Sequence, residues 1–162
     1  MKTEEIIHKL GLVPHPEGGF YTETYRSSES TVTGERKKRN VCTAIYYLLR
    51  GDSKSYFHRI KSDEVWFFHE GNAIEINCII DGEIEQYVLG MDLNSGEFPQ
   101  AIVPPNAWFG AKVKSSEGYA LVSCTVAPGF DFDDFELASR EELLRRYPHL
   151  DASIKEFTKA DF

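Results

Sequence analysis

The amino-acid sequence predicts an all-β barrel or sandwich with short helices at both ends. The chain contains many short segments rich in β-branched and aromatic residues, and glycine or proline residues separate them. No long helical pattern lies between these segments, which favours a closed antiparallel architecture over an alternating α/β fold. The length of 162 residues fits a single domain that spans residues 1–162.

The predicted terminal helices carry recognisable end signals. Residues 3–10 place Glu4 and Glu5 in the first turn, and Gly11 follows the last turn. Near the other end, Ser139 and Glu142 have the spacing of a capping box, in which two side chains satisfy free N–H groups at a helix start. The segment 151–160 predicts one more helical turn.

The predicted strands follow from side-chain alternation and from turn residues. Residues 18–26 alternate like a half-buried strand, and the apolar run 41–49 predicts a strand buried on both faces. The polar residues 27–40 between them predict a solvated loop. Asp81-Gly82 is a strong signal for a two-residue hairpin turn. Further strands are predicted at residues 56–60, 64–69, 74–80, 83–89, 100–103, 107–113 and 119–126.

Charge and composition narrow the classes of partner. The net charge is −8, from 18 basic and 26 acidic residues, and a negative surface disfavours nucleic acid and anionic membranes as partners. The first residues lack the apolar core of a signal peptide, and no apolar run is long enough to span a bilayer. We therefore expect a cytoplasmic protein. Cys42, Cys78 and Cys124 each lie in an apolar segment and are predicted to be buried free thiols.

The segment 51–71 contains the residues that indicate a functional site. His58 and Ile60 share one strand face, because residues two apart on a strand point the same way. On the following strand, Glu64 and Trp66 share a face in the same manner. If both faces line one barrel, an imidazole and a carboxylate meet in an aromatic-walled cavity, which is the outline of a small-molecule site. His58 and Glu64 are the predicted catalytic residues.

The spacing in this segment resembles the metal-binding motif of the cupin superfamily, G-x(5–6)-H-x-H-x(3–4)-E-x(6)-G. Longer matches at residues 10–23, 43–49, 57–66 and 126–137 resemble one of its families, the Cupin_5 type. The resemblance implies a double-stranded β-helix, or jelly roll, that is usually dimeric and has no settled activity. We therefore expect a homodimer.

The match to the cupin motif is incomplete at two of its four ligand positions. Ile60 stands at the second histidine, and Phe109 stands at the histidine of a second motif that begins at Pro104. A catalytic metal commonly needs three protein ligands. We therefore predict no metal ligands and no cofactor, with a bound metal ion as the open alternative.

A more distant resemblance is to the dTDP-sugar epimerases of the RmlC-like group. Their N-terminal strand carries an arginine and a glutamate that help to hold the nucleotide; Glu23 matches the glutamate, but Gly18 replaces the arginine. Their catalytic histidine corresponds to His58. An epimerase also needs a proton donor opposite that histidine, and the candidates are Tyr21, Tyr46 and Tyr119.

The predicted ligand contacts are aromatic or polar side chains near the same cavity. Aromatic rings can stack on a planar ring or a sugar face, and Gln100 can offer a neutral amide. The stretch 130–135 alternates phenylalanine with aspartate, which predicts an edge strand with a charged outer face; the alternative is that it lines the site or a dimer contact. The predicted ligand-binding residues are Tyr21, Glu23, Trp66, Phe68, Gln100 and Trp108.

Three functions are compatible with these residues. The preferred one is binding of a small polar ligand in the barrel, with sugar- or nucleotide-like molecules as candidates. The second is a metal-independent carbohydrate epimerase or isomerase with His58 as the base. The third is a non-catalytic dimeric scaffold with a vestigial pocket.

Overall fold

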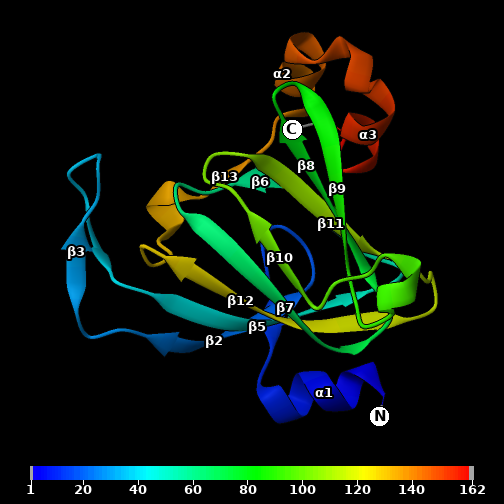
Figure 1. The fold of residues 1–162 in the computed structure, drawn as a ribbon, viewed down its shortest axis with the longest axis horizontal. Coiled ribbons are helices and arrows are strands. Elements are labelled where there is room, and N and C mark those ends of the chain that lie inside the picture. Colours follow the sequence, from blue (N-terminus) through cyan, green and yellow to red (C-terminus); the bar gives the residue numbers. More distant parts are fainter. Residues whose placement is uncertain (1, 161–162) are drawn as a thin grey trace.

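Two antiparallel sheets face each other in the computed structural model, which describes residues 2–160 (Figure 1). The larger sheet has six strands in the order β1-β2-β5-β12-β7-β10, and the smaller has five in the order β13-β6-β11-β8-β9. The strands of the larger sheet are β1 (Val13–Pro14), β2 (Phe20–Arg26), β5 (Thr43–Arg50), β12 (Tyr119–Ala127), β7 (Asp63–Gly71) and β10 (Gln100–Val103). Those of the smaller sheet are β13 (Glu136–Leu137), β6 (Lys54–Arg59), β11 (Trp108–Val113), β8 (Ile74–Ile80) and β9 (Glu83–Leu89).

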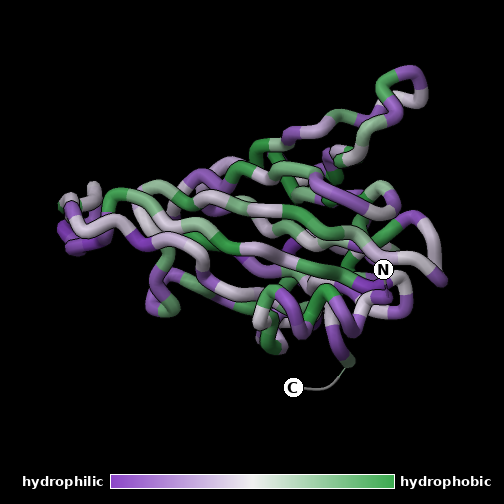
Figure 2. Tube along the Cα trace, turned by 90° about the horizontal axis from the view of Figure 1, so that it is seen from below, coloured by the Kyte–Doolittle hydropathy of each residue, from purple (hydrophilic) through white to green (hydrophobic). Residues whose placement is uncertain are grey.

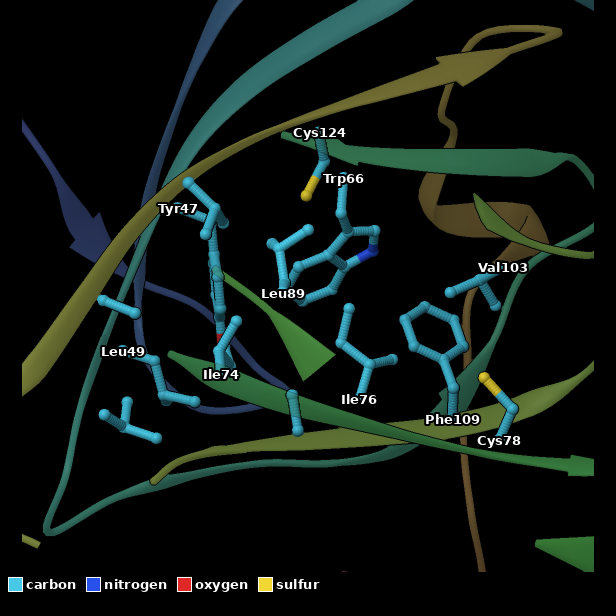
Figure 3. Close-up of a cluster of buried hydrophobic side chains, with 14 residues drawn as sticks. Tyr47, Leu49, Trp66, Ile74, Ile76, Cys78, Leu89, Val103, Phe109 and Cys124 are labelled. Atoms are coloured by element: carbon cyan, nitrogen blue, oxygen red, sulfur yellow. The ribbon is translucent and has the colours of Figure 1, made fainter. Parts of the chain in front are cut away.

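The inner faces of the two sheets enclose the main hydrophobic core (Figure 3). Strand alternation decides which side chains enter it: Ile74, Ile76 and Cys78 of β8 are fully buried there. Trp66 of β7 and Phe109 of β11 meet at the centre from opposite sheets, with ring centroids 6.3 Å apart. The predicted jelly roll is confirmed, because the chain forms a double-stranded β-helix closed around this core.

Short helices cover the outer faces of the barrel, as predicted. Helix α1 (Thr3–Leu10) packs against the outer face of the larger sheet, where Ile6 meets Leu48 of β5. Gly11 ends α1 in the left-handed conformation, with φ 66°. At the other end, the Ser139 hydroxyl accepts a hydrogen bond from the Glu142 N–H at 3.3 Å, which confirms the Ser139 half of the predicted capping box. The remaining helices are α2 (Arg140–Arg146) and α3 (Asp151–Glu156), with short 3₁₀ turns η1 (Leu93–Ser95), η2 (Phe132–Asp134) and η3 (Pro148–Leu150).

The local signals in the sequence place most strands correctly. The hairpin at Asp81-Gly82 joins β8 to β9, and both residues have positive φ, 52° and 79°. This conformation matches the primed turns that the right-handed twist of a hairpin favours. The three cysteines are free thiols, as predicted, and Cys78 and Cys124 are buried. Cys42 is only partly buried, so the prediction of its burial is wrong. Within residues 2–160, no helix is long and apolar enough to cross a membrane.

Two predictions about loops are wrong. Residues 27–40 are not a plain loop but contain a hairpin of β3 (Ser30–Val32) and β4 (Lys38–Asn40), which projects from the barrel and is mostly hydrophilic (Figures 1 and 2). The stretch 130–135 is not an edge strand but contains the η2 turn. The two segments hold each other, because the Arg39 guanidinium donates two hydrogen bonds to the Asp134 carboxylate, at 2.8 and 2.9 Å. Such bidentate pairing fixes the geometry of both partners.

A glycine pair allows the segment before β2 to approach the barrel closely. Gly18 and Gly19 have φ 106° and 78°, a region that other residues rarely adopt. A Cβ on Gly18 would collide with the carbonyl oxygen of Lys54 in β6. The same approach lets the Tyr56 N–H donate to the Glu17 carbonyl oxygen at 2.7 Å, so this turn fixes the position of Glu17.

We therefore expect Gly18→Ala to lower the free energy of unfolding by more than about 2 kcal/mol, because backbone strain and a backbone collision add. Gly34→Ala is the matched control, since a Cβ there meets no atom within 4 Å. Chemical denaturation of both variants measures the difference. Equal stability of the two variants would contradict the close approach of this turn to β6.

Candidate functional site

A small cavity opens inside the barrel near the start of β7, with a volume of about 40 Å³. One part of its wall carries ionisable groups, and the rest is aromatic or aliphatic. His58, Ile60 and Glu64 line it together, so strand parity predicted their common face correctly. The other lining residues are His15, Glu17, Tyr21, Thr43, Ile45, Cys124, Val126, Phe130 and Phe135.

His58 is held by two partners and is only 2% exposed. Its Nδ1 lies 2.7 Å from the Tyr56 carbonyl oxygen, which can only accept, so Nδ1 carries a proton. Its Nε2 lies 2.5 Å from Oε2 of Glu17. Burial lowers the pKa of His58, but the charge and hydrogen bond of Glu17 outweigh this and raise the pKa above its usual value. His58 is therefore an imidazolium in a buried ion pair, with both ring nitrogens occupied.

Glu17 connects the His58 ion pair to a second histidine. Burial alone would raise the pKa of Glu17, but the charges of His58 and His15 lower it below its usual value. The Glu17 N–H donates to Nδ1 of His15 at 3.1 Å, which leaves the proton of a neutral His15 ring on Nε2. Burial lowers the pKa of His15, so that ring is neutral near pH 7. Glu17 thus orients two imidazoles, the charged His58 through its carboxylate and the neutral His15 through its backbone N–H.

Glu64 is the carboxyl group of the site without a charged partner of its own. It is 9% exposed, and its Oε2 accepts a hydrogen bond from the Trp66 indole N–H at 2.7 Å. Its other oxygen has no hydrogen-bond partner among residues 2–160. Burial, together with the charge of Glu17, raises the pKa of Glu64 to about 7. This group therefore changes charge near neutral pH inside the cavity.

The chain matches the family Cupin_5, described as "Cupin superfamily (DUF985)", over residues 4–138. That match covers most of the chain, from α1 to the start of the C-terminal helices. The chain belongs to the Cupin_5 family. The sequence resemblance to this family is thereby confirmed, whereas the likeness to the RmlC-like epimerases is only distant.

Relatives of this Cupin_5 protein span nearly its whole length. A hypothetical protein from Leishmania major is 36% identical with a TM-score of 0.93, and 99% of this chain covers 100% of that one. Protein SO0799 from Shewanella oneidensis is 40% identical with a TM-score of 0.91, and 99% of each chain is covered. The uncharacterized protein YML079W of Saccharomyces cerevisiae is 31% identical over 156 residues, covering 88% of this chain and 78% of that protein. The fold is thus shared over nearly the whole chain with the Leishmania major and Shewanella oneidensis proteins.

The metal site that many cupins carry does not fit these residues. Ile60 and Phe109 occupy two ligand positions of the motif, and both are buried apolar side chains. The nitrogens of His58 are already bound to Tyr56 and Glu17. In the part of the chain that the structure describes, no three His, Cys, Asp or Glu side chains are grouped to hold a metal ion. The chemistry available here is that of protons, hydrogen bonds and charge.

Only Tyr21 of the six predicted ligand contacts lines the cavity. Glu23 lies on the same strand but is exposed, because its carboxylate pairs with Arg26 at 2.6 Å on the surface. Phe68 is partly buried and packs against the main core. Gln100 is exposed at the start of the edge strand β10, opposite Phe67. These three side chains are therefore outside the described wall of the cavity.

The two tryptophans, Trp66 and Trp108, do not form a surface in the cavity on which a ligand can stack. Trp66 is 1% exposed in the core, and its part in the site is the hydrogen bond to Glu64. Trp108 faces outward from β11 into the cluster under the C-terminal helices, because its neighbour Phe109 takes the inward position. The Arg59 guanidinium lies 4.3 Å from the centre of the Trp108 ring. Of the proposed proton donors, Tyr46 packs on the outer face and Tyr119 is bonded to Glu70.

The predicted site residues did not include His15 and Glu17, which both line the cavity. His15 stands between two prolines and precedes the Gly18-Gly19 pair, a rigid segment followed by a special turn. This pattern of prolines and glycines was the signal in the sequence that His15 and Glu17 are held in fixed positions. The alternative that the stretch 130–135 lines the site agrees with the places of its phenylalanines, whose rings lie 6.2 Å apart.

A larger hollow of about 240 Å³ lies outside the barrel, between β6 and the C-terminal segment. Its wall is mainly apolar, with Phe57, Leu137 and Phe157 as its main contributors. None of its described lining residues is a buried acid or base. Of these two hollows, the smaller cavity is therefore the one that carries buried acid–base groups.

We expect Glu17→Gln to lower the pKa of His58 and to destabilise the fold by roughly 1–3 kcal/mol, because a buried cation loses its counter-ion. NMR titration of the imidazole and chemical denaturation measure the two effects. Glu23→Gln removes an exposed carboxylate on the next strand and should change stability by less than about 0.5 kcal/mol. A His58 pKa that is the same in the wild type and in Glu17→Gln would refute the ion pair.

The raised pKa of Glu64 predicts a specific pH dependence of stability. The unfolded chain releases this proton near pH 4.5 and the folded chain near pH 7, so the folded state binds it more tightly. Stability should therefore fall as pH rises from 4.5 to 7, by about 3 kcal/mol, since one pKa unit corresponds to ~1.4 kcal/mol. Glu64→Gln, which stays neutral, should lack this component. If the stabilities of the wild type and of Glu64→Gln changed with pH by the same amount, the raised pKa of Glu64 would be contradicted.

Proposed function

We propose that the barrel cavity binds a small polar ligand, with sugar-like molecules among the candidates. The supporting observation is the free oxygen of Glu64, which lines the cavity and has no hydrogen-bond partner in the described part of the chain. This oxygen keeps some accessible surface, since it is not one of the fully buried, unpartnered side-chain atoms of the described chain. A ligand can therefore reach it and donate a hydrogen bond, and a hydrogen bond to an ionised group contributes about 1.5–3 kcal/mol.

The size of the cavity limits what enters it. Its volume of about 40 Å³ is far below the ~300–1,000 Å³ of pockets that enclose whole drug-sized ligands. One functional group fits beside Glu64, and the rest of a larger ligand stays outside. Phe130 and Phe135 belong to the wall and flank the η2 turn.

A second candidate is a proton-transfer reaction on the bound ligand, such as the epimerisation of a carbohydrate. The observation that favours it is the pKa of about 7 for Glu64, because a general acid or base works best when its pKa lies near the working pH. The base assigned from sequence was His58, but its occupied nitrogens favour Glu64 for this role. Tyr21 is the tyrosine of the same cavity wall and is the candidate proton donor.

The third candidate, a dimeric scaffold with a vestigial pocket, predicts no ligand at all. The homodimer itself stays a prediction from the family resemblance, and dimerisation is compatible with all three functions. A test of ligand binding therefore separates the scaffold function from the ligand-binding and proton-transfer functions.

A thermal-shift experiment tests the binding proposal. Protein dialysed against chelator is heated with neutral sugars, nucleosides and small alcohols and amines as probes. A probe present at 100 times its dissociation constant stabilises the folded state by about 2.7 kcal/mol. We expect at least one probe to raise the melting temperature of the wild type, by roughly 5–10 °C at that concentration.

The matched control is Val126→Phe, which fills the cavity without touching its charges, because Val126 lines the wall from β12. Ile60→Phe serves as a second filled variant if the first does not fold, because Ile60 lines the cavity from the residue just after β6 of the other sheet. The probe that stabilises the wild type should leave the filled variant unchanged. Identical responses of wild type and filled variant to every probe would sink the proposal and favour the scaffold.

A further inference from the structure

The wall of the barrel cavity divides into an acidic part and an aromatic part. Glu17 and Glu64 contribute two carboxyl groups, and no lysine or arginine is among the described lining residues. The aromatic part consists of His15, Tyr21, Phe130 and Phe135. His15 contacts Tyr21 at 4.5 Å and Phe135 at 5.8 Å between ring centroids, so these rings form one continuous surface.

The charges in this wall do not balance when Glu64 is ionised. The Glu17 carboxylate is matched by the His58 imidazolium at 2.5 Å. Glu64 has only the neutral indole of Trp66 as a described hydrogen-bond partner, at 2.7 Å. When Glu64 is ionised, it therefore carries a negative charge without a counter-charge, and the residue is only 9% exposed. Such a charge attracts a cation strongly, because the surroundings screen it weakly.

The aromatic part of the wall favours the same kind of ligand. The faces of aromatic rings carry partial negative charge and attract ammonium groups within about 6 Å of the ring centre. An anion would meet two carboxyl groups and aromatic rings, and no lysine or arginine among the described lining residues would match its charge. A phosphate of a nucleotide has no suitable partner inside this cavity.

We infer that the group which enters the cavity is a small organic ammonium group, held by the Glu64 carboxylate and surrounded by the rings of His15, Tyr21, Phe130 and Phe135. This inference rests on the proposed binding function and names its ligand class as a cationic amine. Its N–H groups, or its polarised methyl groups, face the open oxygen of Glu64. The ammonium takes the place of the cation that the cavity lacks.

The other titratable groups around Glu64 do not replace this cation. His58 is committed to Glu17, and His15 is neutral. Burial raises the pKa of the Cys124 thiol and the Tyr47 hydroxyl well above their usual values, so both are uncharged at neutral pH. Five titratable groups interact electrostatically with Glu64: Glu17, His58, Tyr47, Cys78 and Cys124.

The two tryptophans of the chain provide a reporter and an internal control. The Trp66 indole N–H donates to Glu64, so its NMR signal reports a ligand on that carboxylate. Trp108 lies on the outer side of β11 against Arg59 and should not respond. The probes are ethylammonium, ethanol and acetate, which have similar size and differ in charge, titrated at pH 8 and constant ionic strength.

We expect ethylammonium to shift the Trp66 signal at concentrations on the order of tenfold lower than those that ethanol needs. Acetate should bind more weakly than ethanol. Affinity for ethylammonium should increase about tenfold from pH 6 to pH 8, because Glu64 must lose its proton first. Glu64→Gln, which keeps the shape and removes the charge, should abolish the preference for the amine. Phe135→Leu keeps the charge of Glu64 and removes one aromatic ring. It should lower the affinity for ethylammonium and leave the affinity for ethanol unchanged.

Ethanol or acetate binding as tightly as ethylammonium at Trp66 would overturn the ammonium inference and leave the binding proposal intact. An amine preference that persists in Glu64→Gln would also overturn it. If no probe shifts the Trp66 signal, the ammonium inference fails, and the comparison of wild type with Val126→Phe decides separately whether the cavity binds anything.

Discussion

The buried ion pair between His58 and Glu17 sets the chemistry of this barrel. It links the segment before β2 to strand β6, which are distant in sequence, through a contact of 2.5 Å. The glycine turn that follows Glu17 makes this approach sterically possible, and the Tyr47 hydroxyl supports the turn by donating to the Gly18 carbonyl oxygen at 2.6 Å. Because the pair occupies Nε2 of His58, the histidine that the motif marks as a ligand becomes a fixed internal cation.

The same pair determines the properties of Glu64. Glu17 keeps its negative charge because His58 neutralises it, and that charge disfavours ionisation of a second carboxyl group nearby. In a metal-binding cupin, a cation would offset such carboxylates; here Ile60 and Phe109 have replaced two ligand positions. The result is a site with one ionised and one titrating carboxyl group. Its selectivity then depends on charge and on the aromatic rings around it.

The Arg39–Asp134 pair connects the cavity wall to the periphery of the fold. It joins the projecting hairpin of β3 and β4 to the η2 turn, and Phe130 and Phe135 flank that turn. Arg26 adds a hydrogen bond to the Phe130 carbonyl oxygen at 3.0 Å. The polar segment 27–40, which has no side chain in the described cavity wall, therefore helps to hold the aromatic part of the site in place. Among the basic residues 36–39 of this segment, Arg39 therefore stabilises the fold through its contact with Asp134.

The sequence by itself determined the features that depend on neighbouring residues. Alternation gave His58 and Ile60 a common face, the Asp81-Gly82 turn fixed a hairpin, and the Ser139 cap started a helix, because each depends on residues close together in the chain. That Glu64 of β7 lines the same cavity as His58 of β6 follows from the barrel, since the two strands belong to different sheets. Only the tertiary structure decided which carboxylate pairs with His58, that Trp108 faces outward, and that Phe130 and Phe135 close the cavity. These outcomes depend on which segments approach one another across the barrel, and no local periodicity encodes that. The approach of Glu17 to His58, across some forty residues of chain, is a long-range contact of this kind.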